Sequence, residues 1–268
     1  MLKDITLGQF FPGNTVVHRL DPRTKLLILI VYFVALFMAV NYFSYALVFA
    51  FLATATILGR IPLKSMTKGL KPMLIFIVLT AALNLFYTKE GTLLVDWKFI
   101  HIYSGGIKKA CFMVLRIMML ITGTFLLTYT TSPIALTDAL ERLLSPLKKL
   151  RVPVHEVAMM MSIALRFIPT LIEETDKIIS AQKARGADFE TGSLFKRAKA
   201  LIPILVPLFI SAFRRADELA TAMECRCYHG GEGRTRLRVL RFRLRDYLAF
   251  AVAAALLAGV IVLRHFGL

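Results

Sequence analysis

The feature that most constrains this chain is a stretch without any charged residue, which runs from Leu26 to Gly59. An α-helix crosses the hydrocarbon core of a bilayer with about 20 apolar residues, so this stretch is too long for one crossing. The polar segment 41–44, Asn-Tyr-Phe-Ser, predicts a tight turn near its middle. We therefore expect two membrane-spanning helices, one on each side of this turn.

The composition of the chain excludes an ordinary water-soluble domain. Hydrophobic residues make up 57% of the 268 residues, whereas soluble domains hold about 45–50%. The formal net charge is +17, from 34 basic and 17 acidic residues. Such a combination is typical of a membrane protein whose cytoplasmic loops are basic. The positive charge alone also leaves nucleic acid open as a partner.

Three more apolar segments, separated by polar ones, are predicted to span the membrane: 72–88, 110–131 and 247–263. Residues 89–107 are predicted to form a mixed loop. The arm 1–25, the loop 60–71 and the segment 132–245 are rich in Lys and Arg. With five spans they fall on one side, and the positive-inside rule makes that side the cytoplasm.

The predicted fold class is thus an all-α integral membrane protein with about five transmembrane helices and a cytoplasmic N-terminus. Residues 1–131 hold the arm and four spans, 132–245 a cytoplasmic helical region, and 246–268 the fifth span. A short helix is expected over 133–145, because Ser-Pro is a favourable start of a helix.

Two long amphipathic helices are predicted within the cytoplasmic region. From Val154, apolar residues recur every three or four positions, and this helix should end at Gly186, because glycine suits the left-handed position past a C-terminus. A second helix with the same spacing runs from about Leu205 to about Arg226. Small residues four apart on it let two helix backbones cross closely: Ala212, Ala216 and Ala220.

Each of these two helices carries an arginine at its predicted end, Arg185 on the first and Arg226 on the second. An arginine in the last turn favours the negative end of the helix dipole, which suffices for either residue alone. Two such arginines on paired helices indicate docking to a partner, because a guanidinium binds carboxylates bidentately or bonds backbone carbonyls.

Four stretches in this order carry a resemblance to a known family: 11–25, Ala184-Arg185-Gly186, Cys225-Arg226-Cys227 and 228–236. The sequence resembles the transmembrane coupling component, or T component, of energy-coupling factor transporters. These are ABC-type importers of vitamins and transition-metal ions in prokaryotes. The second triplet departs from the family's Ala-Arg-Gly pattern, since a cysteine stands on each side of the arginine.

The resemblance implies a non-catalytic subunit of the prokaryotic cell membrane. The two triplets would dock on two cytoplasmic ABC ATPase subunits. ATP-driven motion would pass through the crossed helices to a separate membrane-embedded, substrate-binding subunit, the S component, which would set the substrate. The apolar helix faces would pack on each other and hold the S component through Met161, Ile168, Leu171, Ala212, Ala216, Ala220 and Met223.

A run of arginines precedes the fifth span: Arg234, Arg236, Arg238, Arg241, Arg243 and Arg245. We expect these residues to face anionic membrane lipids, because the positive-inside rule and headgroup attraction explain such a run. Nucleic-acid binding would need a basic patch together with a recognised fold, so no nucleic acid is expected as a partner.

No metal or cofactor is expected. Cys225, Cys227 and His229 alternate as soft ligands, but zinc sites use wider pairs and a fourth ligand. The segment 230–233 lacks the Lys-Ser/Thr ending of a P-loop, so ATP hydrolysis is expected in partner chains. The carboxylates at 173, 174 and 176 are interpreted as a solvated helix face.

Two rival functions are a self-contained ABC permease and a membrane enzyme acting on lipids. The first would need paired polar residues in the spans, and the second clustered histidines or carboxylates near the interface. The spans offer little beyond Asn41, Asn84, Arg116 and several threonines. Arg116 has two interpretations, a side chain that snorkels to the interface or one that contacts a partner or a neighbouring helix.

Overall fold

The computed structural model describes residues 10–88, 90–97, 100–187, 189, 193–230 and 240–266. The described residues form two compact units. We call residues 10–139 with 240–266 the bundle unit, and the described residues of 140–230 the crossed-helix unit.

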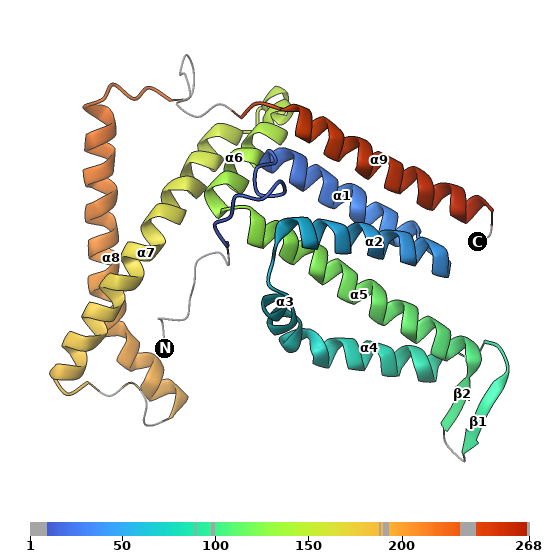
Figure 1. Ribbon diagram of the computed structural model, residues 1–268. Coiled ribbons are helices and arrows are strands. Elements are labelled where there is room, and N and C mark those ends of the chain that lie inside the picture. The colour runs from blue at the N-terminus through green and yellow to red at the C-terminus, as the bar shows by residue number, and fades with distance from the viewer. Residues whose placement is uncertain are drawn as a thin grey trace. The chain divides into compact units, whose positions relative to one another are not determined.

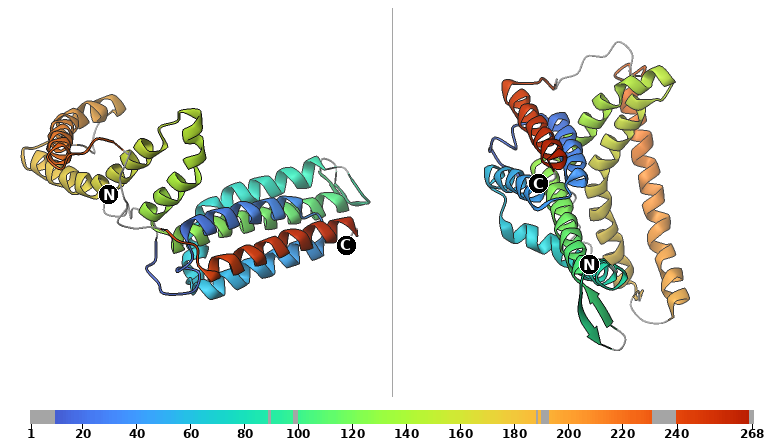
Figure 2. Two further views of the ribbon diagram at one scale, coloured as in Figure 1. Left: turned by 90° about the horizontal axis from the view of Figure 1, so that it is seen from above. Right: turned by 90° about the vertical axis from the view of Figure 1, so that its right-hand side faces the viewer.

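The bundle unit consists mainly of long helices that lie side by side (Figure 1, Figure 2). Its elements in chain order are α1 (Pro22–Met38), α2 (Tyr42–Gly59), α3 (Leu63–Leu70), a 3-10 turn (Lys71–Met73), α4 (Leu74–Tyr87), β1 (Leu93–Trp97), β2 (Ile100–Tyr103), α5 (Ser104–Thr130) and α9 (Leu244–His265). Helix α6 (Pro133–Leu143) contains the boundary between the units.

The charge-free stretch forms α1 and α2, and the chain turns between Met38 and Tyr42. The predicted division into two helices is therefore confirmed, but the turn lies at 39–41, and three of the four residues predicted for it belong to α2. Helix α1 begins at Pro22, earlier than the apolar stretch itself, because its first turn is capped. The Asp21 carboxylate accepts a hydrogen bond of 2.9 Å from the Arg23 N–H, and the proline fits the first helical position.

The core of the bundle unit lies around the middle of α1, where Tyr32 is 2% exposed. The Tyr32 hydroxyl donates a hydrogen bond of 3.0 Å to the Met119 carbonyl of α5. Gly123 allows this close approach, since a Cβ there would lie 2.7 Å from the tyrosine ring. The other fully buried side chains of this core come from α1, α2 and α9, among them Leu36, Val48 and Val260.

Four chain segments meet at one end of the bundle: the N-terminal arm, the starts of α1 and α9, and the end of α5. The buried Lys25 ammonium of α1 donates to the Thr130 carbonyl of α5 over 2.7 Å. The Asp21 N–H donates to the carboxylate of Asp246 in α9 over 2.8 Å. The α1–α2 turn and the hairpin lie at the other end. The helices α1, α2, α4, α5 and α9 run between these two ends.

Five helical stretches of the described chain are long and apolar enough to cross a membrane: Tyr42–Gly59, Lys64–Tyr87, Ser104–Thr130, Val154–Ala184 and Leu244–His265. This set contains α7 (Val154–Ala184) and omits α1, which has 17 residues but the same apolar character. The all-α membrane fold is confirmed. Because α7 also qualifies as a span, its expected cytoplasmic location stays a prediction.

The crossed-helix unit contains a 3-10 turn (Ser145–Leu150), α7 and α8 (Leu194–Glu224). Helix α7 has the predicted bounds. Helix α8 differs, since it begins eleven positions before the expected start at Leu205, with the Ser193 hydroxyl accepting from the Lys196 N–H. Both of its interior prolines, Pro203 and Pro207, are exposed. The carbonyls that lose a partner at these prolines therefore need not be buried.

Two further boundaries correct the sequence predictions. The expected loop 89–107 contains an antiparallel hairpin, in which Asp96 pairs with His101 and Trp97 with Ile100. Helix α5 begins at Ser104, six residues before the expected start, and directly follows the second strand. The mixed composition of this segment predicts a loop, whereas pairing between the two short strands decides its structure.

Candidate functional site

Helix α7 ends in a Schellman motif centred on Gly186. The φ angle of this residue is +84°, a left-handed conformation that glycine adopts without steric cost. The Ala187 N–H donates to the Gln182 carbonyl and the Gly186 N–H to the Lys183 carbonyl, each over 3.0 Å. These two bonds define the motif. They fix Arg185 as the residue immediately before the left-handed position.

Helix α8 ends in the same motif, built from other residues. The φ angle of Cys227 is +54°, so the left-handed position holds a cysteine. The Tyr228 N–H donates to the Met223 carbonyl over 3.1 Å, and the Cys227 N–H to the Glu224 carbonyl over 2.8 Å. Arg226 is therefore fixed as the residue before the left-handed position.

The two triplets thus present Arg185 and Arg226 in equivalent backbone settings. Both arginines are exposed, and within the described part of the chain neither guanidinium forms a hydrogen bond or an ion pair. Each offers five N–H donors to an external acceptor. In Figure 1 the C-terminal end of α7 lies below the point where the helices cross, and that of α8 lies above it. The neighbouring triplet residues are also exposed: Ala184, Gly186, Cys225 and Cys227.

The crossing of α7 and α8 is held by a charged cluster. The Arg215 guanidinium of α8 donates to the Glu174 carboxylate of α7 over 2.9 Å, and the Ser211 hydroxyl donates to the same carboxylate. The side chains of Glu174 and Arg215 are 24% and 34% exposed. The interpretation of Glu174 as part of a solvated face is therefore wrong, because its partners lie on the other helix.

Comparison with known proteins decides the family. A family model described as "Cobalt transport protein" matches residues 13–237. An energy-coupling factor transporter transmembrane protein from Ruminiclostridium cellulolyticum is 52% identical over 265 residues, which cover 99% of this chain and 99% of the relative. Its counterpart from Thermosediminibacter oceani is 54% identical over 263 residues (98% and 99%), and that from Bacillus subtilis 49% over 260 residues (96% and 98%).

The chain belongs to the family of energy-coupling factor transporter transmembrane proteins. The resemblance to T components is confirmed. The chain is a multi-pass membrane component of a transporter of this kind.

The apolar faces of this T component differ from the predicted packing at α8. The α8 side toward α7 holds the half-buried Ser211 and Arg215, which both contact Glu174. Ala212 is half-buried, but Ala216 and Ala220 are exposed and therefore do not lie in the crossing. The face of α8 that contacts α7 is therefore displaced by about one residue from the face that carries the predicted alanines.

Much of the remaining apolar surface of the crossed helices is exposed. Met161 of α7 is 45% exposed, whereas Ile168, Leu171 and Met223 are half-buried. Along α8 the exposed large apolar side chains include Leu205, Val206, Phe209, Ile210 and Phe213. Contiguous apolar surface of this kind marks a contact with a protein partner or a membrane.

Half of the predicted lipid-facing arginines can be placed. Arg241, Arg243 and Arg245 are exposed at the start of α9, whereas Arg234, Arg236 and Arg238 lie outside the described residues. The three cysteines are all unbridged and exposed. Among the described residues, His, Cys, Asp and Glu form no group of three that would hold a metal ion.

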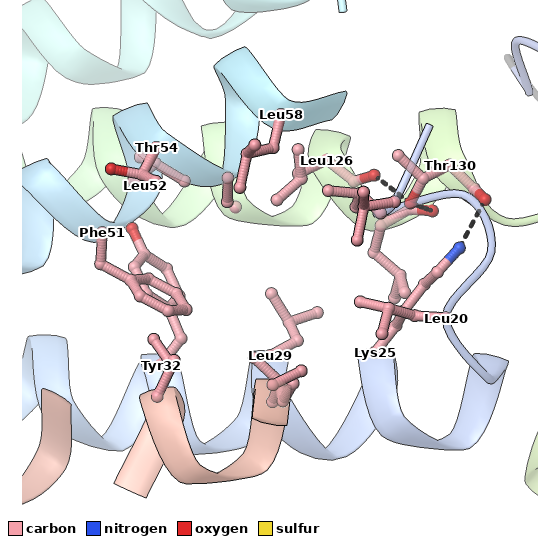
Figure 3. Close-up of a pocket in the computed structure, with 18 of the residues that line it drawn as sticks. Leu20, Lys25, Leu29, Tyr32, Phe51, Leu52, Thr54, Leu58, Leu126 and Thr130 are labelled. Atoms are coloured by element: carbon pink, nitrogen blue, oxygen red, sulfur yellow. Dashed lines mark hydrogen bonds between the residues drawn. The ribbon is translucent and has the colours of Figure 1, made fainter. Parts of the chain in front are cut away.

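A cavity of about 360 Å³ lies between α1, α2, α5 and α9 (Figure 3). Its walls are mostly apolar, with Leu29, Phe51 and Leu126 among them. At one end, Lys25 donates to the Thr130 carbonyl. The lining hydroxyls of Tyr32, Thr54 and Thr130 likewise donate to backbone carbonyls within the bundle. Lys25 and Tyr32 link α1 to α5 in this way, whereas the two threonines bond within their own helices.

Sequence reasoning missed three residues that organise the structure, Glu174, Lys25 and Asp246. Each makes its decisive contact with a residue far away in the chain. A weak signal existed for Lys25 and Asp246, since each is a charge at the first turn of a span. A charge placed there calls for a partner.

Proposed function

We propose that this T component couples two cytoplasmic ATPase subunits to a substrate-binding S component in the membrane. The observation that carries the proposal is the repeated helix ending, which holds Arg185 and Arg226 exposed in the same backbone setting. Each guanidinium docks in a polar groove of one ATPase subunit. The end of the bundle that carries the N-terminal arm faces the cytoplasm, as the positive-inside rule requires for its basic segments.

The crossed helices suit transmission of movement. Long helices are stiff along their length, and the Glu174–Arg215–Ser211 cluster fixes the point where they cross. A displacement of the docked end of either helix therefore also moves the other helix of the pair. The exposed apolar side chains of α7 and α8 supply the contact for the S component, with Met161 and Phe209 among them.

The large cavity of the bundle supports coupling over self-contained transport. Its walls are mostly apolar, and Lys25 and the lining hydroxyls already donate to backbone carbonyls, so the cavity offers few free donors to a polar substrate. The substrate is instead recognised by the S component.

The test is copurification from membranes solubilised in mild detergent. The wild-type chain should bring down ATPase subunits, and Arg185→Glu with Arg226→Glu should abolish this, because a carboxylate reverses the docking charge. Arg214→Glu is the matched control, since Arg214 is an exposed arginine of α8 away from the helix end. Equal recovery of ATPase with wild type and the double variant would refute the arginine roles. No ATPase with the wild type would refute coupling.

A further inference from the structure

Arg116 of α5 lies at the end of the bundle where α1 ends and α2 begins. Its guanidinium donates to the Ala39 carbonyl at the C-terminus of α1 over 3.0 Å, which bears out the interpretation of a contact with a neighbouring helix. Its charged carbon lies 5.7 Å from the centre of the Tyr45 ring and 5.8 Å from that of Phe37. Among the described residues, no carboxylate forms an ion pair with Arg116.

Two polar groups, one on this arginine and one on its neighbour, are buried without a hydrogen-bond partner among the described residues. They are the Nε–H of Arg116 and the hydroxyl of Tyr45, a side chain that is 5% exposed. A buried donor without a partner costs about 1–3 kcal/mol. A buried charge without a counter-charge costs more, and charged groups inside membrane proteins mark functional sites for this reason.

The side chains of Arg116 and Tyr45 line a second cavity of about 240 Å³, together with Lys109, Asn84, Val40, Phe112 and Met113. The volume lies below the range of roughly 300–1,000 Å³ that is typical of drug-sized ligands. One wall is aromatic, because Phe112 packs on Tyr45 with ring centres 4.8 Å apart.

The charge around this cavity is positive. Lys109 forms an exposed ion pair with Glu90 over 2.7 Å, which offsets its charge. Lys108 lies 5.2 Å from the centre of the Tyr42 ring and Arg116 has no acidic partner, so two positive charges remain at this end of α5. Helix α2 also begins here, at Tyr42, and the start of a helix favours a negative group.

We propose that the cavity at Arg116 and Tyr45 binds a phosphate group. A guanidinium matches a phosphate through two parallel N–H donors, and the Nε–H of Arg116 supplies one of them. The Tyr45 hydroxyl donates to a third oxygen position. The cavity lies at the level where α1 ends, so the phosphate comes from a lipid headgroup or from solution. The site is separate from the helix ends that dock the ATPases.

The experiment uses the full chain, delipidated in a neutral detergent, and isothermal titration with three probes. Dioctanoyl phosphatidylglycerol presents the phosphate on a lipid, inorganic phosphate presents it alone, and dioctanoylglycerol lacks it. The wild-type chain should bind at least one of the first two saturably and should not bind dioctanoylglycerol. Binding of phosphatidylglycerol alone identifies a lipid as the source, and binding of both identifies a phosphate site open to solution.

Variants separate the site from general charge. Arg116→Gln should weaken binding at least tenfold. Tyr45→Phe keeps the ring and should weaken binding about threefold to tenfold through one lost hydrogen bond. Arg264→Gln is the matched control, since Arg264 is an exposed arginine in the last turn of α9 and does not line the cavity, and its binding should equal that of the wild type.

Three results would overturn the proposal: no binding of either phosphate probe, equal binding of dioctanoylglycerol, or wild-type binding by Tyr45→Phe and Arg116→Gln. If Arg116→Gln fails to fold because the bond to Ala39 is lost, Tyr45→Phe decides alone.

Discussion

Cys227 holds the same backbone position at the end of α8 that Gly186 holds at the end of α7, one residue beyond the exposed arginine of each helix. Both have positive φ angles, +54° and +84°. The departure of the second triplet from an Ala-Arg-Gly pattern therefore leaves the geometry of the helix end intact. Cysteine accepts this conformation at a steric cost that glycine does not have.

Replacing Cys227 by glycine should stabilise the end of α8. A side chain in the left-handed region costs roughly 1–2 kcal/mol, part of which is offset by the greater freedom of glycine in the unfolded chain. We expect a net gain of about 1 kcal/mol, seen as about fivefold greater hydrogen-exchange protection of the Tyr228 amide. Gly186→Ala should lower protection of the Ala187 amide to a similar extent.

Cys225→Gly is the control for this comparison. Cys225 directly follows the last residue of α8 and has a right-handed helical φ angle of −59°, where glycine is less favourable than a residue with a side chain. Hydrogen-exchange protection of the Tyr228 amide should therefore fall in Cys225→Gly. The same sign of change for Cys225→Gly and Cys227→Gly would contradict the explanation from backbone conformation.

The Glu174–Arg215 pair should matter for transport more than for docking. Both side chains are partly exposed, so solvent screening keeps their coupling in a double-mutant cycle small. Glu174→Ala or Arg215→Ala should loosen the crossing. Substrate uptake by the assembled transporter should then fall several-fold, while ATPase subunits still copurify with the chain.

The exchange of charges tests this pair directly. Glu174→Arg with Arg215→Glu should recover part of the uptake that either single substitution removes, since opposite charges again face each other. Loss of ATPase copurification in the single alanine variants would show instead that the cluster supports the docking ends themselves.

The sequence predicted those parts of the structure that depend on neighbours along the chain. The end of α7 was predictable because Gly186 suits the left-handed position past a helix C-terminus, and the division into α1 and α2 because the charge-free stretch is too long for one span. The start of α8 was not, because Pro203 and Pro207 act as helix breakers in a local reading. Both prolines lie on the exposed side of α8, so the carbonyls that lose a hydrogen bond there need not be buried.

The arginines of the candidate site were predictable from the sequence, but the contacts between α7 and α8 were not. Periodicity placed Arg185 and Arg226 at helix ends, yet it gave no means of finding that Arg215 contacts Glu174 or that Ala216 is exposed. The angle and the offset between two helices decide such contacts. A shift of about one residue in the facing side of α8 moves an alanine out of the crossing and an arginine into it.

Asp246 should be needed for the junction of α1 and α9. It is 2% exposed, and its carboxylate accepts hydrogen bonds of 2.8 Å from the N–H groups of Asp21 and Arg243. Asp246→Asn replaces one accepting oxygen by an NH₂ group, which leaves one buried N–H without an acceptor. We expect a loss of about 1.5–3 kcal/mol in unfolding free energy, measured in detergent by urea titration.

A matched control for this substitution is Asp217→Asn, since Asp217 is an exposed carboxylate of α8. It should change the unfolding free energy by less than about 0.5 kcal/mol. Equal effects of the two substitutions would mean that the buried hydrogen bonds of Asp246 contribute nothing specific.

His18 should make the docking of the N-terminal arm depend on pH. Its Nε2 lies 3.0 Å from the Phe11 carbonyl and its Nδ1 lies 2.7 Å from the Thr15 hydroxyl. Burial lowers the pKa of His18 below the ordinary value of 6.5; the positive charge of Lys25 also lowers it, while the bond to Phe11 acts in the opposite direction. The undocked arm therefore binds a proton more readily than the docked arm.

It follows that the docked arm has its full stability above pH 6.5 and loses stability as the pH falls from 6.5 through the lowered pKa. A nitroxide label at Asn14→Cys, with the native cysteines replaced by serine, reports this as increased mobility between pH 7.5 and pH 5. His18→Gln removes the titrating group, so its label should show the same mobility at both pH values. His18 would be excluded as the cause of the pH dependence by either of two results. The label mobility could fall on acidification in the protein that retains His18, or it could change equally in His18→Gln.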